Sequence, residues 1–204
     1  MIYSCLLVLN LFLPQPLFLV PVNSEDRSYV GSIQLTEIGN YGIMRKARPT
    51  VKEHLHTGID ILPPNSNYES DEPIFPFTDG IVISKREDGP FANIIIEHDI
   101  NGELVWSVYE HIAGIKVEIG EHVIPTRPIA RFFKAEELNK IGWQFNHFHF
   151  EILKSQPIPI EASEIHPNRN FNAYTLSCHT PSDLQQHYYS PLIFLRKMMT
   201  KGGY

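Results

Sequence analysis

The segment Asn146-His-Phe-His-Phe-Glu151 decides how this sequence is interpreted. Aromatic residues alternate with polar ones, and an alternation with a period of two is typical of a β-strand with one buried face. His147 and His149 are then expected on one face of the strand, and Phe148 and Phe150 on the other. One face is expected to form a site, and the other is expected to join the hydrophobic core.

A second histidine cluster, His54-Leu-His-Thr-Gly-Ile-Asp60, lies about ninety residues earlier in the chain. His56 and Asp60 are four residues apart, so in an extended segment both side chains point to the same face, and Gly58 between them lets the backbone bend. An imidazole nitrogen together with a carboxylate oxygen suits zinc. His54 has the parity of His56 but precedes the pair, and a surface position is expected for it.

Short apolar runs between the two clusters, rich in β-branched and aromatic residues, predict further strands at residues 80–84, 93–97 and 104–109. Turn dipeptides separate these runs. Asn101-Gly102 is the clearest hairpin signal, because both residues tolerate the positive φ of a tight turn. The spacing predicts a mainly β fold, an antiparallel β-sandwich or a barrel-like domain.

The length of 204 residues suits one domain with appendages. The net charge is -6 and no run of lysine and arginine occurs, so no nucleic-acid partner is expected. Cys5 lies in the apolar N-terminal segment and leaves Cys178 alone in the rest of the chain, so no internal disulfide is expected. The chemistry is therefore sought in the two histidine clusters.

The first 22 residues contain no charged side chain and predict an export signal over residues 1–24. An uncleaved N-terminal membrane anchor is the alternative, although Pro14 and Pro16 would interrupt a spanning helix. In both cases the rest of the chain is expected in the periplasm, the cell envelope or the extracellular space. Residues 155–204 are interpreted as a proline-bearing linker and a short helical tail that Pro191 interrupts.

Residues 42–154 resemble the lysostaphin or LytM-type zinc endopeptidases, whose pattern is His-x-x-x-Asp, Tyr-x-His and His-x-His. The corresponding segments here are His56-Thr-Gly-Ile-Asp60, Tyr109-Glu-His111 and His147-Phe-His149. The intervening segments 76–82 and 93–98 also fit the family's pattern. The resemblance implies a metallopeptidase domain over residues 27–154.

The resemblance also implies a role for each of these side chains. His56, Asp60 and His149 would bind Zn²⁺, and His111 and His147 would be the catalytic residues beside the open position. Zinc lowers the pKa of bound water to about 7, and a neutral histidine can accept a proton from that water. Which of the two histidines is the general base stays open.

The expected function is hydrolysis of peptide bonds in peptidoglycan stem peptides or cross-bridges. The alternative is a catalytically silent module of the same fold that regulates other cell-wall hydrolases. One departure from the family pattern concerns the substrate groove. The family usually has a glycine- and serine-rich loop before His-x-His, whereas residues 132–146 are bulkier, with a predicted helix at 134–140 and with Trp143 as a candidate lining residue.

Overall fold

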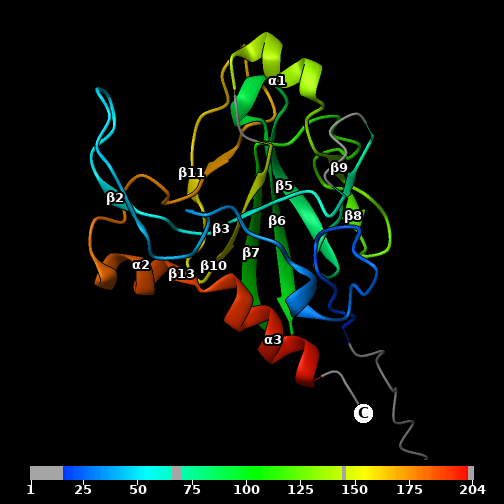
Figure 1. Ribbon diagram of the computed structural model, residues 1–204. Helices are drawn as coiled ribbons and strands as arrows, with labels where there is room; N and C mark the ends of the chain where they lie inside the picture. The colour runs from blue at the N-terminus through cyan, green and yellow to red at the C-terminus, as the bar shows by residue number, and fades with distance from the viewer. Residues whose placement is uncertain (1–15, 66–69, 144–145, 202–204) are drawn as a thin grey trace, which may run out of the picture.

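The computed structural model describes residues 16–65, 70–143 and 146–201. Its centre is one antiparallel sheet (Figure 1), in which the strands follow the order β13, β10, β7, β6, β5 and β8, and in which β3 also pairs with β10. Within the described residues these strands are β3 (Ile59–Ile61), β5 (Gly80–Arg86), β6 (Asn93–Ile100), β7 (Glu103–Glu110), β8 (His122–Val123), β10 (Phe148–Leu153) and β13 (Tyr188–Tyr189). The predicted mainly β, antiparallel, sandwich-like fold is confirmed, and the sheet does not close into a barrel.

The centre of the sheet is the hairpin of β6 and β7, which pair from Asn93↔Glu110 to Ile100↔Glu103. Asn101 and Gly102 form its turn with φ values of 56° and 86°, in the left-handed region that asparagine and glycine tolerate. The predicted hairpin is therefore confirmed. Alternation along the paired strands gives the sheet two distinct faces.

The first face of the sheet carries the main hydrophobic core. Ile94 and Ile96 of β6, Tyr109 of β7, and Phe148 and Phe150 of β10 are each 0% exposed there. The Tyr109 and Phe150 rings lie 5.1 Å apart between centroids. The predicted division of β10 into an aromatic face and a histidine face is thus confirmed for its buried phenyl rings.

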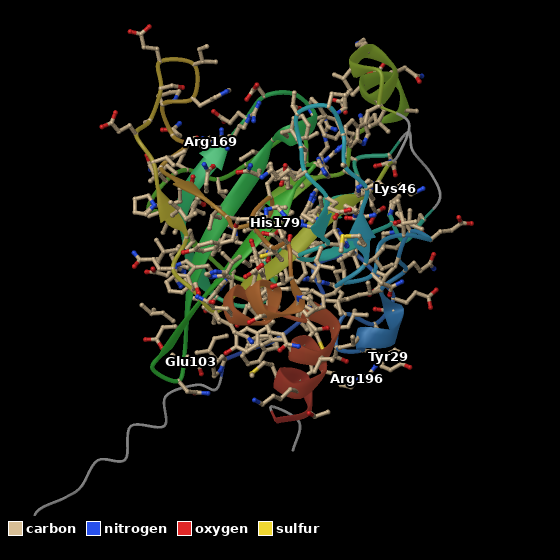
Figure 2. The ribbon with its side chains drawn as sticks, turned by 90° about the vertical axis from the view of Figure 1, so that its left-hand side faces the viewer. Tyr29, Lys46, Glu103, Arg169, His179 and Arg196 are labelled. Atoms are coloured by element: carbon tan, nitrogen blue, oxygen red, sulfur yellow. The ribbon has the colours of Figure 1, made fainter. Side chains whose placement is uncertain are left out.

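The second face carries a smaller cluster, which the C-terminal tail covers. Trp106 and Val108 of β7 and Leu153 of β10 pack there against Cys178 and Tyr188 of the tail. In Figure 2 the tail crosses in front of the sheet, with His179 near the middle of the molecule. The tail is therefore one of the layers of the fold.

Three α-helices and two short 3-10 helices occur within the described residues. Figure 1 shows α1 at one end of the sheet and α2 and α3 at the opposite end. Their bounds are η1 (Val30–Ser32), η2 (Gly89–Phe91), α1 (Ala135–Ile141), α2 (Pro181–His187) and α3 (Pro191–Lys201). The helix predicted at 134–140 is present as α1. The tail has two short helices, α2 and α3, and its helical pattern is interrupted at residues 188–190, directly before Pro191, which begins α3.

Three pairs of short strands complete the fold within the same ranges, each antiparallel. They are β1 (Met44–Arg45) with β2 (His54–Leu55), β4 (Pro73–Ile74) with β9 (Ala130–Arg131), and β11 (Ile158–Pro159) with β12 (Phe171–Asn172). The first pair supports the segment that carries His56.

The N-terminal segment packs against the domain from residue 18 onward. Val20 and Val22 are 0% and 1% exposed in the main core, and Val22 forms an antiparallel bridge with Ile74. Residues 1–15 of the predicted export signal lie outside the described residues. None of the helices in the described part of the chain has the length and apolarity of a membrane span.

Candidate metal centre

Pairing of β3 with β10 brings the two histidine clusters together. Asp60 of β3 lies opposite His149 of β10, and His56 precedes β3 in the same segment. Gly58 permits this approach, because a Cβ atom at that position would lie 2.2 Å from the Phe150 carbonyl oxygen. Glycine is needed here for close contact between backbones.

Three buried acceptor atoms face one another at this point. The distance from His56 Nε2 to Asp60 Oδ1 is 3.0 Å, from His149 Nδ1 to Asp60 Oδ1 is 3.0 Å, and from His56 Nε2 to His149 Nδ1 is 2.9 Å. The three residues are 5%, 6% and 5% exposed. They form a cluster of the kind that can hold a metal ion.

The other ring nitrogen of each histidine fixes the tautomer. His56 Nδ1 lies 2.9 Å from the Asn40 carbonyl oxygen and must donate to it, and His149 Nε2 lies 2.9 Å from Glu151 Oε1 and must donate likewise. In the neutral rings the nitrogens that face Asp60 are therefore unprotonated. Two lone pairs and a carboxylate oxygen then converge, an arrangement that needs a cation or a proton between them.

The geometry and chemistry of this donor set fit zinc. Two imidazoles and one carboxylate with an open fourth position are a common catalytic set, and a tetrahedral ion with bonds of about 2.0–2.2 Å separates its donors by roughly 3.3 Å. The observed edges of 2.9–3.0 Å are close to that spacing. Burial lowers the pKa of His149, but the hydrogen bonds to Asp60 and Glu151 outweigh burial and raise it to about 10, so the pocket favours positive charge.

The second oxygen of Asp60 is held by Arg45 of β1, whose guanidinium lies 2.5 Å from Oδ2. Only Oδ1 is therefore left to face the histidines. Burial raises the pKa of Asp60, but its close contacts with the His149 and His56 imidazoles outweigh burial and hold that pKa far below its usual range. Asp60 is consequently an anion across the physiological pH range.

His111 and His147 lie beside these donors. Their ring centroids are 5.4 Å apart, His147 Nε2 is 3.9 Å from Asp60 Oδ1, and the His111 ring is 6.4 Å from that of His149. Burial lowers the pKa of each to about 4, so both rings are neutral at pH 7. His111 Nδ1 donates to the Pro90 carbonyl, which leaves its Nε2 as an acceptor.

An aromatic wall stands next to His111. Trp143 lies with its ring centroid 5.2 Å from His111 and 6.0 Å from Phe91. It follows α1, which Gly142 ends in the left-handed conformation at φ 69°. In the segment that departs from the family pattern, α1 is a folded helix and the half-buried Trp143 after it packs beside His111.

All five predicted site residues are brought together, whereas two other histidines lie elsewhere. His98 is 0% exposed and bonds Asp79 O and Ser107 Oγ, which fits a structural role. The surface position expected for His54 is wrong, since its exposure is 4%. The tail covers β2 there, because Leu55 N donates to the Cys178 carbonyl at 2.8 Å.

The residues that support the donors were not among the predicted site residues. Glu151 shares the strand parity of His149, so this partner could have been found from the alternation along β10. Arg45, and the hydroxyl groups of Thr57 and Thr175 that bond Glu151, carry no sequence signal of this kind. Their positions follow only from tertiary packing.

The fold is similar to that of several solved proteins, two of which are described as peptidases. Lysostaphin from Staphylococcus simulans, described as an antimicrobial peptidase, superposes with a TM-score of 0.50 at 14% identity over 83% of this chain and 52% of its own. A zinc-containing peptidase from Vibrio cholerae gives 0.45 at 24% identity, over 76% of this chain and 39% of its own. LytU gives 0.44 at 24% identity, over 61% and 75%. The chain thus spans less than two thirds of the first two proteins.

No curated protein matches the sequence. The model of peptidase family M23, in contrast, matches residues 54–161, a stretch that includes all five predicted site residues and more than half of the chain. This match confirms the resemblance to lysostaphin and LytM-type peptidases. The chain belongs to peptidase family M23.

Proposed function

We propose that this chain is a zinc-dependent endopeptidase that hydrolyses peptide bonds in peptidoglycan. The observation that carries the proposal is the triangle of His56 Nε2, Asp60 Oδ1 and His149 Nδ1, with edges of 2.9–3.0 Å and with two neutral histidines beside it. Three protein donors with an open position characterise catalytic zinc, whereas structural zinc sites have four protein ligands.

Each side chain has a defined task in such a reaction. Bound by His56, Asp60 and His149, zinc supplies the Lewis acidity that activates a water molecule and polarises the scissile carbonyl. His111 and His147 start as neutral acceptors, so either ring can take the proton of the attacking water. The protonated ring then donates to the leaving amine and balances the developing negative charge.

The substrate class and the location rest on the motifs. Peptidoglycan stem peptides or cross-bridges are proposed because the three histidine motifs follow the order of the lysostaphin type. The apolar first 22 residues support export to the periplasm, the cell envelope or the extracellular space. The segment with α1 and Trp143 replaces the family's small-residue loop, so the preferred peptide is expected to differ from that of family members with this loop.

The test combines metal analysis with digestion of isolated peptidoglycan, for the parent chain and for His149→Ala. The parent is expected to bind about one zinc per chain and to release peptide fragments, and the variant is expected to do neither, because one of three protein ligands is gone. His122→Ala is the matched control, since His122 lies on β8 at the far edge of the sheet and its side chain is 59% exposed.

The outcomes separate the two hypotheses. Zinc binding without any cleavage of wall peptides would favour the silent regulatory module over the peptidase. A parent chain that binds no zinc, or a His149→Ala variant that cleaves as fast as the parent, would refute the proposed site.

A further inference from the structure

Glu151 is a fully buried carboxylate directly behind a proposed zinc ligand. It is 0% exposed, and three donors converge on its Oε1: His149 Nε2 at 2.9 Å, Thr57 Oγ1 at 2.5 Å and Thr175 Oγ1 at 2.9 Å. No partner of Oε2 occurs among the described residues. Because a buried carboxylate is costly without hydrogen bonds, these donors determine where Oε1 lies.

The two hydroxyl groups reach Glu151 from different parts of the chain. Thr57 adjoins His56, whereas Thr175 belongs to the tail, beyond residues 54–161 of the family match. Its position is fixed from the Tyr188 side, since the Tyr174 backbone N–H donates to the Tyr188 hydroxyl at 2.7 Å. Thr175 thus brings a hydroxyl group of the tail to the carboxylate behind His149.

The tail is also fixed to the strand that precedes the other metal-binding segment. The Cys178 carbonyl accepts from Leu55 N at 2.8 Å, and His179 Nδ1 lies 2.8 Å from the Glu53 carbonyl oxygen. Figure 2 shows His179 in front of the sheet. Residues 174–179 therefore connect β2, which leads to His56, with β10, which carries His149.

We propose that Thr175 is a positioning residue of the metal centre, which acts through Glu151 to hold His149 with its Nδ1 toward the ion. The proposal rests on the zinc-binding function inferred above. The Thr175 hydroxyl holds Oε1, Oε1 accepts the Nε2 proton of His149, and that hydrogen bond fixes both the ring orientation and the tautomer. The C-terminal tail is in this way part of the site.

The expected loss of zinc affinity follows from the position of Thr175 in the series of hydrogen bonds from Thr175 through Glu151 to His149. Loss of a partner that hydrogen-bonds a metal ligand weakens metal binding by about 10–100-fold. Thr175 is one hydrogen bond further from the ion, and Thr57 still bonds Oε1. We therefore expect the zinc dissociation constant of Thr175→Val to rise about tenfold, at the lower end of that range.

The experiment measures zinc affinity by chelator competition on the whole chain for the parent, Thr175→Val and Thr175→Ser. Serine keeps the hydroxyl group and is expected to restore affinity to within about twofold, whereas valine keeps the shape and removes the donor. Ser177→Ala is the matched control, because the Ser177 hydroxyl bonds the Tyr174 carbonyl at 2.8 Å and does not reach Glu151. Thermal unfolding of the metal-free forms accompanies each measurement.

A double variant tests whether Thr175 acts on His149 through Glu151. In a Glu151→Leu chain the acceptor that links Thr175 to His149 is gone, so adding Thr175→Val is expected to weaken zinc binding by less than about twofold. A further tenfold loss in that background would overturn the proposal. So would a valine variant that binds zinc like the parent and is only less stable without metal, or a serine variant as weak as valine. If the parent itself binds no zinc, the proposed function fails as well.

Discussion

His111 and His147 differ from the three donor residues in their surroundings. The three donor atoms lie 2.9–3.0 Å from one another, whereas His147 Nε2 lies 3.9 Å from Asp60 Oδ1 and the His111 ring lies 6.4 Å from the His149 ring between centroids. His147 Nδ1 is buried and has no hydrogen-bond partner among the described residues. The Nε2 atom of the same ring lies beside the three donor atoms, so this ring is placed to exchange protons at the proposed metal site.

Replacing either histidine with alanine should therefore separate metal binding from catalysis. We expect His147→Ala and His111→Ala to retain about one zinc per chain and to lower kcat for wall-peptide hydrolysis by about 10²–10⁴-fold, the usual contribution of a general acid or base. Zinc content and kcat are measured on the same preparations, with His122→Ala as the control. Loss of zinc together with activity would place these residues among the ligands.

At the same scale, sequence was informative about residue identity and uninformative about surroundings. The period of two along residues 147–151 was sufficient to place Phe148 and Phe150 in the core. It was insufficient for His54, because burial of this residue depends on a tail more than a hundred residues later in the chain. Local patterns specify a face of a strand, and what covers that face is decided by distant segments.

Among the elements, the N-terminal segment packs against the domain although it lies before the predicted domain boundary at residue 27. Its backbone runs along residues 74–77, with Leu19 N bonded to Phe77 O at 2.9 Å and Phe75 N bonded to Pro21 O at 3.0 Å. The end of the export signal at residue 24 stays a prediction. Cleavage at that point would remove these hydrogen bonds and two fully buried valines.

A chain that begins at residue 25 is expected to be less stable than one that begins at residue 16. Burial of a valine side chain contributes about 1.5–3 kcal/mol, and part of this offsets the entropy of ordering the segment. We expect a net loss of about 3 kcal/mol from Val20 and Val22, or a Tm lower by about 10 °C for a domain of this size. Calorimetry of the two chains provides the measurement. Equal Tm values would show that the segment adds no stability.

Elements were predictable where they are long or capped, and less so where they are short. β6 and β7 followed from β-branched runs around Asn101-Gly102, and α1 followed from its helical spacing. The pairing of β3 with β10 has no local signal, since β3 has only three residues. The proximity of Asp60 and His149 was therefore predicted from the family resemblance and not from the sequence pattern.

For the whole molecule, the two faces of the sheet differ in role: one holds the main hydrophobic core, and the other holds the candidate metal site. The first face buries the larger core, and the second carries the metal donors above the cluster that the tail completes. His98 belongs to the first face, with Nδ1 donating to Asp79 O and Nε2 accepting from Ser107 Oγ, both at 2.7 Å. It is therefore held in one neutral tautomer, away from the site.

His98 should make the stability of the whole chain depend on pH. Burial lowers the pKa of His98 to about 4, whereas an unfolded histidine has a pKa of about 6.5. As the pH falls from about 7 to about 4.5, the unfolded state takes up a proton that the folded state refuses, so the free energy of unfolding decreases by about 2 kcal/mol. Urea unfolding of metal-free parent and His98→Gln chains at both pH values isolates this contribution, because every other titrating group is shared. The variant should be less stable near pH 7 and lose about 2 kcal/mol less on acidification, and an equal loss in both chains would mean that His98 is protonated in the folded state.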